Sequence, residues 1–208
     1  MKRAAVDLTV ERTLWRKGFV RVAGVDEAGR GPLAGPVVAA AVVFPKDCTI
    51  DGVNDSKQLS PERRELLYEE IQKHAVSVGV GTVEHDVIDR INILRATHLA
   101  MRSALRALSV RPDFAIIDGN SFSDETLPFL TIIGGDARSF TIAAASIVAK
   151  VVRDRRMREL DLRYPGYGFG QHKGYGTQMH LEAIRKYGLC EIHRKSFHLS
   201  IVQEELFP

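Results

Sequence analysis

The sequence of 208 residues predicts an α/β domain in which helices pack against a mixed β-sheet. Three observations favour this class. Five short apolar segments have the length and composition of strands, longer segments with helical spacing accompany them, and the first two strand segments have no helix between them. The resulting order, β-β-(helix)-β-α-β-β-α, differs from that of a strictly alternating doubly wound fold.

The first part of the chain supplies a short helix and two strands. Residues 2–16 have the pattern of a helix, and the apolar run 19–25 predicts the first strand. Residues 36–44 are apolar throughout, which is typical of a strand buried on both faces. Since only a Gly- and Pro-rich connection joins the two strands, we expect them to be antiparallel neighbours.

A second helix is predicted to begin after Ser60, which can cap it, with Pro61 in its first turn. It extends to about residue 73, and three apolar side chains are expected to face inward: Leu66, Leu67 and Ile71. Residues 74–83 alternate valine with small residues and predict the third strand.

The remaining elements follow from the same patterns. Residues 92–108 have helical spacing, with five inward positions: Leu94, Thr97, Met101, Leu105 and Leu108. A short buried strand is predicted at 114–117 and a fifth strand at 130–133. Helices are predicted at 141–163 and 177–187, and Gly188 ends the last one.

The composition limits the class of protein. Hydrophobic residues make up 45% of the chain, enough for a full core, and no apolar run reaches the roughly 18 residues of a membrane-spanning helix. The charged N-terminus has no apolar signal core, and Cys48 and Cys190 are too few for a disulfide framework. We therefore expect a cytoplasmic protein, and a monomer because no helix shows an apolar dimerisation stripe.

The net charge of +3 is unevenly distributed. Lys and Arg outnumber Asp and Glu between Lys150 and Lys195, as a polyanion-binding face would require. Charge alone slightly favours a solvated helix over such a face.

The most informative segment is 25–36, in which an apolar strand reaches Asp26 and Glu27 and a loop with Gly29, Arg30 and Gly31 follows. Carboxylates suit Mg²⁺ or Mn²⁺, which take oxygen ligands. The glycines let the backbone come close to a ligand, and Arg30 offers a planar charged group. The segment indicates a metal beside a phosphate, although a plain structural turn explains it about as well.

Two more apolar runs end near a carboxylate beside glycine, one at Asp118 and one at Asp136. Any single Asp of this kind usually only starts a turn. If the strand ends are neighbours, however, four carboxylates share a small volume, where repulsion raises their pKa values unless divalent ions bind. Because adjacent residues of a regular strand face opposite ways, we expect the strand to end or bulge at Asp26 and Glu27.

Such a cluster suits phosphoryl transfer. Two ions about 3.5–4 Å apart stabilise the attacking and leaving oxygens without a side-chain nucleophile. The chain has no G-x-S-x-G elbow for a serine nucleophile and no Walker phosphate loop.

The ordered motifs of the chain resemble those of the bacterial ribonuclease HII family, the type 2 ribonucleases H. Each motif is weak alone, but together they cover nearly the whole chain in order. They are DEAGRGPLAGP from Asp26, NDSKQLS from Asn54, IDGN from Ile117, Asp136 followed by AAASIVAK from Ala143, YPGYGF from Tyr164, HKGYGT from His172 and HRKSF from His193.

The resemblance implies a ribonuclease H-like fold with a five-stranded sheet and a helical C-terminal extension. It implies one domain, with a catalytic core at about 18–163 and a substrate-contacting extension at about 164–208. The implied activity is cleavage of RNA in RNA–DNA hybrids and incision 5′ of single ribonucleotides in duplex DNA, as in ribonucleotide excision repair. The products would carry 3′-hydroxyl and 5′-phosphate ends, and the cofactor would be Mn²⁺ or Mg²⁺, two ions per site with substrate bound.

Site residues carry over by position. Asp26, Glu27, Asp118 and Asp136 match the family's metal-binding carboxylates, Asp136 less closely because its spacing from Asp118 varies in the family. Substrate contacts are implied for another five residues: Gly29, Arg30 and Gly31 at the ribose 2′-hydroxyl and its phosphate, Lys57 at a phosphate, and Tyr175 at the step from ribonucleotide to deoxyribonucleotide. Tyr164 and Tyr167 are alternatives to Tyr175.

Histidines 172, 180, 193 and 198 lack the spacing of a compact zinc site, and we expect them on the surface or at phosphates. Lys150 and Asp154 are expected to form a solvated helix pair. Ser146 has either a packing or a substrate-positioning role, and Trp15 is expected to pack.

Two alternative functions stay open at this point. One is a non-catalytic protein that binds hybrids, and the other is a different two-metal enzyme of the same fold, such as a resolvase or integrase. The four carboxylates argue against a pure binder, because acids facing phosphates weaken binding.

Overall fold

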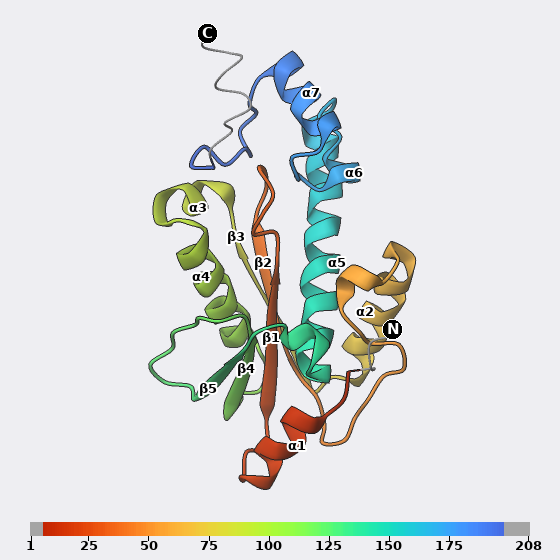
Figure 1. Ribbon diagram of the computed structural model, residues 1–208, viewed down its shortest axis with the longest axis vertical. Coiled ribbons are helices and arrows are strands. Elements are labelled where there is room, and N and C mark those ends of the chain that lie inside the picture. Colours follow the sequence, from red (N-terminus) through yellow and green to blue (C-terminus); the bar gives the residue numbers. More distant parts are fainter. Residues whose placement is uncertain (1–5, 198–208) are drawn as a thin grey trace.

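The computed structural model describes residues 6–197, which form a five-stranded sheet with helices on both faces (Figure 1). The strands are β1 (Val22–Ala28), β2 (Val37–Val43), β3 (Ser77–Val83), β4 (Phe114–Asp118) and β5 (Phe129–Ile132). The α-helices are α1 (Thr9–Arg16), α2 (Pro61–His74), α3 (His85–Ile91), α4 (Ile93–Arg106), α5 (Phe140–Arg163), α6 (Phe169–His172) and α7 (Gln178–Tyr187). Short 3-10 helices occupy Ser56–Gln58 (η1) and Gly135–Ala137 (η2).

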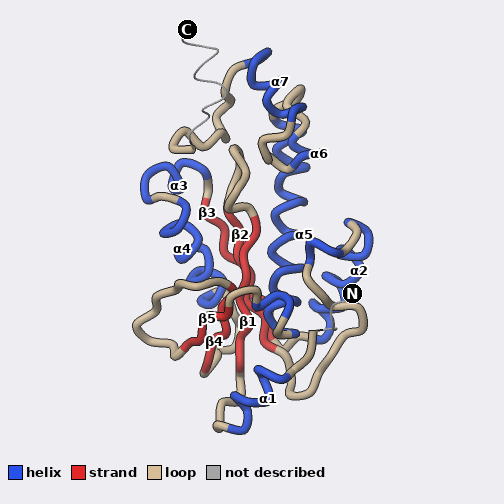
Figure 2. Tube along the Cα trace, viewed as in Figure 1, coloured by secondary structure: helices blue, strands red, loops and turns tan. Residues whose placement is uncertain are grey.

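The sheet is mixed, in the order β3-β2-β1-β4-β5 (Figure 2). Strands β1, β2 and β3 form an antiparallel meander, whereas β4 and β5 run parallel to β1. The predicted antiparallel pairing of the first two strands is therefore confirmed. Because β1 and β4 are parallel neighbours, their carboxyl ends lie at the same edge of the sheet, which places Asp118 near the end of β1.

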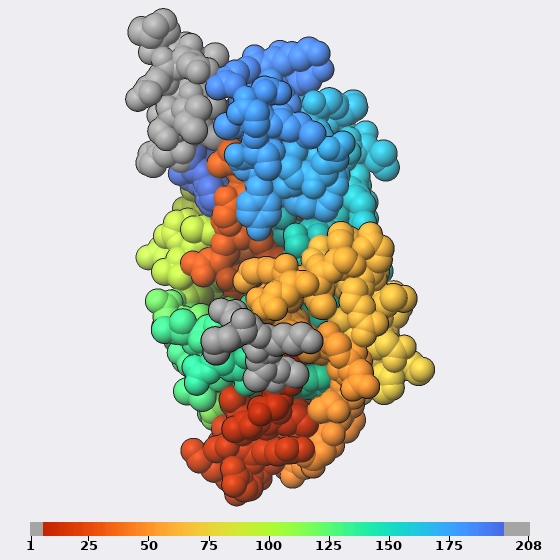
Figure 3. Space-filling view, turned by 45° about the vertical axis from the view of Figure 1, so that its right-hand side comes forward, coloured from red at the N-terminus to blue at the C-terminus, as the bar shows by residue number. Residues whose placement is uncertain are grey.

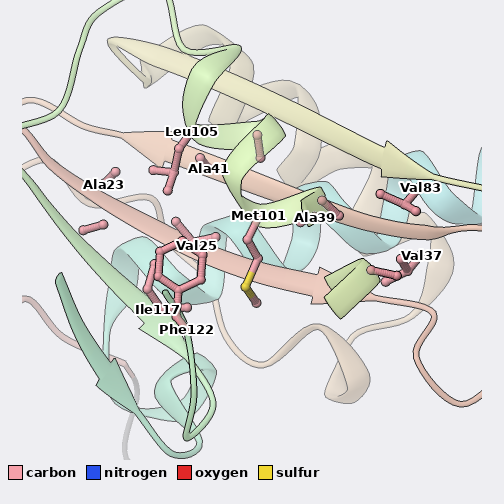
Figure 4. Packing of buried hydrophobic residues seen from close by; sticks show 14 of the residues in the cluster. Ala23, Val25, Val37, Ala39, Ala41, Val83, Met101, Leu105, Ile117 and Phe122 are labelled. Atoms are coloured by element: carbon pink, nitrogen blue, oxygen red, sulfur yellow. The ribbon is translucent and has the colours of Figure 1, made fainter. Parts of the chain in front are cut away.

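Helices cover each face of the sheet with a different set of strand residues. Met101 and Leu105 of α4 point toward the alanines and valines of β1 and β2 (Figure 4). Ala40 and Val42 of β2 face the other way and pack against α5. All seven residues of β2 are buried, as the apolar pattern predicts.

Some details differ from the sequence-based expectations. The first helix begins at Thr9 rather than residue 2, and residues 1–5 lie outside the described range. Helix α3 was not predicted, because seven residues carry little periodic signal. Leu66 and Leu94 are exposed, since each lies one position off the buried stripe of its helix. None of the described helices is both long and apolar enough to cross a membrane.

The C-terminal region extends one end of the molecule. Helix α5 has 24 residues and continues past the sheet, and α6 and α7 pack beside its end (Figure 1). The blue C-terminal region lies against the orange-red segment of the β1–β2 connection (Figure 3). Three backbone hydrogen bonds join the two: Leu33 to Gly174, Gly35 to Ile192 and Arg194 to Leu33.

Close approach of α4 to β3 depends on two glycines. A Cβ atom on Gly79 or Gly81 would lie 2.1 Å from a backbone carbonyl oxygen of α4. Non-bonded heavy atoms do not approach this closely, so a larger residue at either position would push the helix off the sheet.

We predict that Gly81→Ala destabilises the protein by about 2–3 kcal/mol, because overpacking forces backbone shifts. Chemical denaturation of wild type and variant checks this. Thr82→Ala, at the exposed neighbouring position of β3, serves as the control and should cost less than about 1 kcal/mol. Equal effects of the two substitutions would contradict the packing argument.

Candidate active site

Three carboxylates meet where β1 and β4 end. One oxygen atom each of Asp26, Glu27 and Asp118 lies within 4.8 Å of the others. Asp26 is buried, and the other two residues are partly buried. The structure thus brings together three of the four acids singled out from the sequence.

The strand geometry at this point differs from the expectation. Strand β1 neither ends nor bulges at Asp26, because its antiparallel register with β2 continues to Ala28. Its pairing with β4 stops at Val25, opposite Ile117. The edge of β1 is therefore open beyond Val25, and the carboxylates of Asp26 and Glu27 can both reach Asp118 around that open edge.

Burial and mutual repulsion disfavour the charged forms of these acids. Burial raises the pKa of Asp26 well above its ordinary value, and the charges of Glu27 and Asp118 raise it further. Burial also raises the pKa of Glu27, although Arg30 opposes this with a contact of 3.4 Å. The pKa of Asp118 is raised by burial and by Asp136, against a 2.6 Å hydrogen bond from the Gly135 amide.

Asp136 lies beside the three carboxylates but outside their close group. It is buried in η2, and its Oδ2 atom is 3.4 Å from Nζ of Lys57. Partial burial lowers the pKa of Lys57, but the charges of Asp136, Asp26 and Asp55 outweigh it and raise the pKa. Because the Lys57 side chain is 79% exposed, its ammonium group remains accessible beside the acids.

A buried serine pair supports Asp26 from α5. The hydroxyl groups of Ser56 and Ser146 are 2.7 Å apart, and the Ser146 hydroxyl hydrogen-bonds the Asp26 carboxylate and so partly offsets its raised pKa. The sequence left the role of Ser146 undecided, because nothing local shows that residue 146 faces residue 26.

Two buried arginines hold the glycine-rich loop by its carbonyl groups. Arg194 donates to the carbonyl oxygens of Gly29 at 2.6 Å, Arg30 at 3.0 Å and Gly35 at 2.9 Å. Arg153 donates to those of Pro36 and Ala34. Neither arginine has a carboxylate within 4.0 Å in the described part of the chain, and burial lowers the pKa of Arg194 to about 9 and of Arg153 to about 10.

These contacts fix the direction of the loop amides. In a planar trans peptide the C=O and N–H bonds point in opposite directions. Since the Gly29 and Arg30 carbonyls point at Arg194, the amides of Arg30 and Gly31 point away from it. Neither amide has an acceptor among residues 6–197, so both are available to a ligand.

Gly29 is required by this arrangement. Its φ of +96° disfavours any side chain, and a Cβ atom would lie 2.0 Å from Nε of Arg153. Arg153 and Arg194 were missed as functional candidates in the sequence, since an arginine bonding backbone carbonyls has no motif of its own.

Tyr175 lies over the same loop. Its ring is 3.7 Å from the position that a Cβ atom of Gly31 would take, and its side chain is 44% exposed. Tyr167, by contrast, is buried and donates a hydrogen bond to the Gly188 carbonyl, and Tyr164 donates to Glu191. Of these three tyrosines, Tyr175 is the one whose ring lies against the glycine loop.

Two expectations about polar residues were wrong. His180 and His193 are buried, not on the surface or at phosphates, and His198 lies outside the described range. Lys150 and Asp154 form a 2.8 Å ion pair that is largely buried rather than solvated. Trp15 packs in the core as expected.

The carboxylate cluster fits divalent cations. Several buried acids with raised pKa values are stabilised by a bound cation, and hard oxygen ligands select Mg²⁺ or Mn²⁺ over softer metals. A mixed sheet has carboxylates near the ends of two neighbouring strands, and the adjoining loop has amides with no acceptor among residues 6–197. Together with a basic C-terminal region, this arrangement defines a metal-dependent nuclease of the ribonuclease H type.

Comparison with known proteins specifies the family. The ribonuclease HII family model matches residues 23–200. A ribonuclease HII from Geobacter sp. (strain M21) is 56% identical over 199 residues, covering 96% of this chain and 86% of the relative. One from Acetivibrio thermocellus is 54% identical over 187 residues, covering 90% and 73%. The chain belongs to the ribonuclease HII family and is an endoribonuclease that acts on RNA–DNA hybrids.

Solved structures agree with the fold. Ribonuclease H2 from Pyrococcus horikoshii OT3 matches with a TM-score of 0.73 and 30% identity, over 90% of this chain and 98% of that one. The ribonuclease HII in a PCNA complex from Archaeoglobus fulgidus matches with a TM-score of 0.72 and 28% identity, over 86% and 96%. The predicted ribonuclease H-like fold is confirmed.

We predict that Asp26→Asn stabilises the metal-free protein at pH 8 by about 1–3 kcal/mol. The amide keeps an acceptor for the Glu27 amide, which now bonds the Asp26 carboxylate at 2.7 Å, and removes a buried charge. Because the folded-state pKa of Asp26 is raised, the wild type gains stability from Asp26 as pH falls, and the difference between the two proteins should shrink toward pH 4.

Thermal unfolding in EDTA across pH measures this difference. Added Mn²⁺ should stabilise the wild type more than the variant. Asp51→Asn, at an exposed position, is the control. It should change neither the stability in EDTA nor the stabilisation by Mn²⁺. A destabilised Asp26→Asn protein in EDTA would contradict the electrostatic interpretation.

Proposed function

We propose that the chain incises duplex DNA on the 5′ side of a single embedded ribonucleotide, in addition to hydrolysing RNA in RNA–DNA hybrids. The observation that carries this is the position of the glycine loop. It follows directly from the Asp26–Glu27 pair, has two amides without an acceptor among residues 6–197, and lies under an exposed tyrosine. The loop that would recognise one ribose thus adjoins the carboxylates that would hold the ions for cleavage of the nucleic-acid backbone.

The four carboxylates would hold the catalytic ions. Asp26, Glu27 and Asp118 supply the close group, and Asp136 adds an acid on its Lys57 side. We propose Mn²⁺ or Mg²⁺, two ions with substrate present; when bound, they activate water and neutralise charge at the scissile phosphate. The protein's own part is to hold the acids rigidly on β1, at the end of β4 and in η2. The cleavage products would carry 3′-hydroxyl and 5′-phosphate ends.

Recognition is assigned to the loop and its neighbours. The 2′-hydroxyl is the group that distinguishes RNA from DNA at one position, and a rigid backbone amide can contact it closely. We assign this contact to the amides of the Gly29–Gly31 segment. Tyr175 would stack at the junction between ribonucleotide and deoxyribonucleotide, and the ammonium group of Lys57 would contact a phosphate.

The alternatives carry less support. A non-catalytic hybrid binder gains nothing from buried acids that repel phosphates and each other. A resolvase or integrase would have no use for amides suited to a 2′-hydroxyl. Monomeric state and cytoplasmic location stay predictions from the sequence.

We predict that the wild type cleaves a duplex with one ribonucleotide in Mn²⁺ or Mg²⁺, and that EDTA abolishes cleavage. Asp118→Asn should lower turnover by at least about 10³-fold while substrate affinity changes by less than about tenfold, because it removes a ligand and not a phosphate contact. Product ends are mapped on sequencing gels. An all-DNA duplex is the control, and its cleavage, or wild-type turnover by Asp118→Asn, would reject the assignment.

Tyr175→Ala tests the junction contact. We predict a roughly tenfold loss of kcat/KM on the single-ribonucleotide duplex relative to a uniform RNA–DNA hybrid, since stacking on an aromatic ring contributes about 1–3 kcal/mol per base. Tyr164→Ala, at a tyrosine that bonds Glu191 instead of lying against the glycine loop, is the matched control. Equal losses on both substrates would show that Tyr175 contributes to general affinity only.

A further inference from the structure

Three histidine rings of the C-terminal region, two of them buried, lie next to one another beneath Tyr175. The ring centroids of His172 and His180 are 4.4 Å apart, and those of His180 and His193 are 5.2 Å apart. His180 and His193 are fully enclosed, and Phe169 packs edge-on to the cluster. The carboxylate site does not include these rings, and the burial of His180 and His193 leaves them no surface for a substrate to contact.

The hydrogen bonds of the cluster define the tautomer of each ring. The Cys190 amide donates to Nδ1 of His193 at 2.9 Å, so the His193 proton is on Nε2. Nδ1 of His193 also lies 3.2 Å from the Cys190 carbonyl oxygen, but the Cys190 amide proton points at this nitrogen and makes it an acceptor. In the same way, the Gly174 amide donates to Nδ1 of His172, whose Nε2 donates to the Tyr167 carbonyl at 2.7 Å.

The central ring then has one possible arrangement. Nε2 of His180 is 3.1 Å from Nε2 of His193, and two protons cannot occupy that contact. Since His193 is the donor, His180 accepts there and carries its proton on Nδ1. Nδ1 of His180 donates to the carbonyl oxygen of Tyr175 at 3.0 Å. A directed chain thus runs from Cys190 through His193 and His180 to Tyr175, and all its members are neutral.

Neutral rings are also what the surroundings favour. Burial lowers the pKa of His180 to about 4, and burial lowers the pKa of His193. At neutral pH neither ring carries the second proton that would break the chain.

The chain contributes one of the hydrogen bonds that hold the backbone around the Tyr175 ring. The Tyr175 amide donates to the His172 carbonyl, the Tyr175 carbonyl accepts from Nδ1 of His180 and from the Thr177 amide, and the Gly174 carbonyl accepts from the Leu33 amide. The Tyr175 side chain makes no hydrogen bond among the described residues, and its ring centroid lies 6.0 Å from the Arg153 guanidinium. Its ring position over the glycine loop therefore depends on the backbone from which it projects.

The same segment also holds the loop beneath the ring. His193 forms an isolated β-bridge with Ala34, and the adjoining Arg194 fixes the Gly29 and Arg30 carbonyls. Residues 193 and 194 thus connect to both recognition elements, the first through His180 and the second directly.

We propose that His180 and His193 are positioning residues for ribonucleotide recognition: their neutral, directed hydrogen-bond chain sets the Tyr175 ring against the glycine loop. The inference rests on the junction-sensing role proposed for Tyr175. Neither histidine touches the substrate, and both act through the Tyr175 backbone.

Crossed isosteric substitutions test the proposal. An asparagine amide mimics Nδ1 of histidine, and a glutamine amide mimics Nε2. His180→Asn keeps the donor to Tyr175 and His180→Gln loses it, whereas His193→Gln keeps the donor to His180 and His193→Asn loses it. The measured quantity is kcat/KM on the single-ribonucleotide duplex divided by kcat/KM on a uniform hybrid.

We expect His180→Gln and His193→Asn to lower this ratio roughly fivefold, the effect of one lost neutral hydrogen bond. His180→Asn and His193→Gln should stay within about twofold of wild type. His74→Gln, at a partly exposed histidine of α2, is the control for loss of an imidazole. Equal ratios for the two variants at each position would overturn the proposal, and if one pair fails to fold, the other pair gives the same comparison.

A double variant separates this inference from its premise. If His180 acts through Tyr175, then His180→Gln combined with Tyr175→Ala should show the same ratio as Tyr175→Ala alone; a further fall would overturn the positioning role. An unchanged ratio for Tyr175→Ala alone would instead reject the sensing role itself. Nitrogen-15 NMR should show His180 protonated on Nδ1 and His193 on Nε2 at pH 7, and the opposite tautomers would overturn the chain.

Discussion

Repulsion among buried carboxylates is the constraint on which the site depends. Asp26, Glu27 and Asp118 are held within 4.8 Å at the end of a tightly packed sheet, where burial already disfavours their charges. The fold stabilises this unfavourable group from outside, through the fully buried strand β2 beside β1 and the long helix α5 behind it. The packing of β2 and α5 thus compensates for the repulsion among the carboxylates, and a bound divalent cation would reduce that repulsion.

The glycine loop is held by positively charged side chains, whereas the site beside it is built from carboxylates. Arg153 and Arg194 are buried without a close carboxylate among residues 6–197, and their guanidinium groups bind backbone carbonyls instead. A carbonyl held inward leaves its amide facing outward, so the cations convert a flexible glycine loop into a fixed donor surface. Rigid donors discriminate one hydroxyl group better than mobile side chains, because less conformational entropy is lost on binding.

Much of the fold and part of the site could be predicted from the sequence. Uniformly apolar β2 and the capped helix after Ser60 are local signals, and their partners follow from short connections. The convergence of Asp26 with Asp118 could be inferred because each follows an apolar strand segment and lies close to glycine in the sequence. The continuation of β1 through Glu27 could not, since it depends on where β4 stops pairing. The roles of Arg194 and His180 also depend on contacts with residues distant in sequence, so no local pattern marks them.

The segment from Val25 to Pro36, the end of β1 and the glycine loop, therefore joins two electrostatic environments that do not neutralise each other. Its first residues include the carboxylates of Asp26 and Glu27, which a divalent cation would stabilise. Its later backbone carbonyls accept hydrogen bonds from Arg153 and Arg194, which have no carboxylate nearby among residues 6–197. The one ion pair within the loop, Arg30 with Glu27 at 3.4 Å, is long and half-exposed. If the buried arginines paired with the buried acids, the site would be more stable and chemically inert. Their separation by a rigid glycine turn leaves the acids free for metal ions and the amides free for a nucleotide, and this separation is what the C-terminal region maintains through Arg194 and the histidine chain.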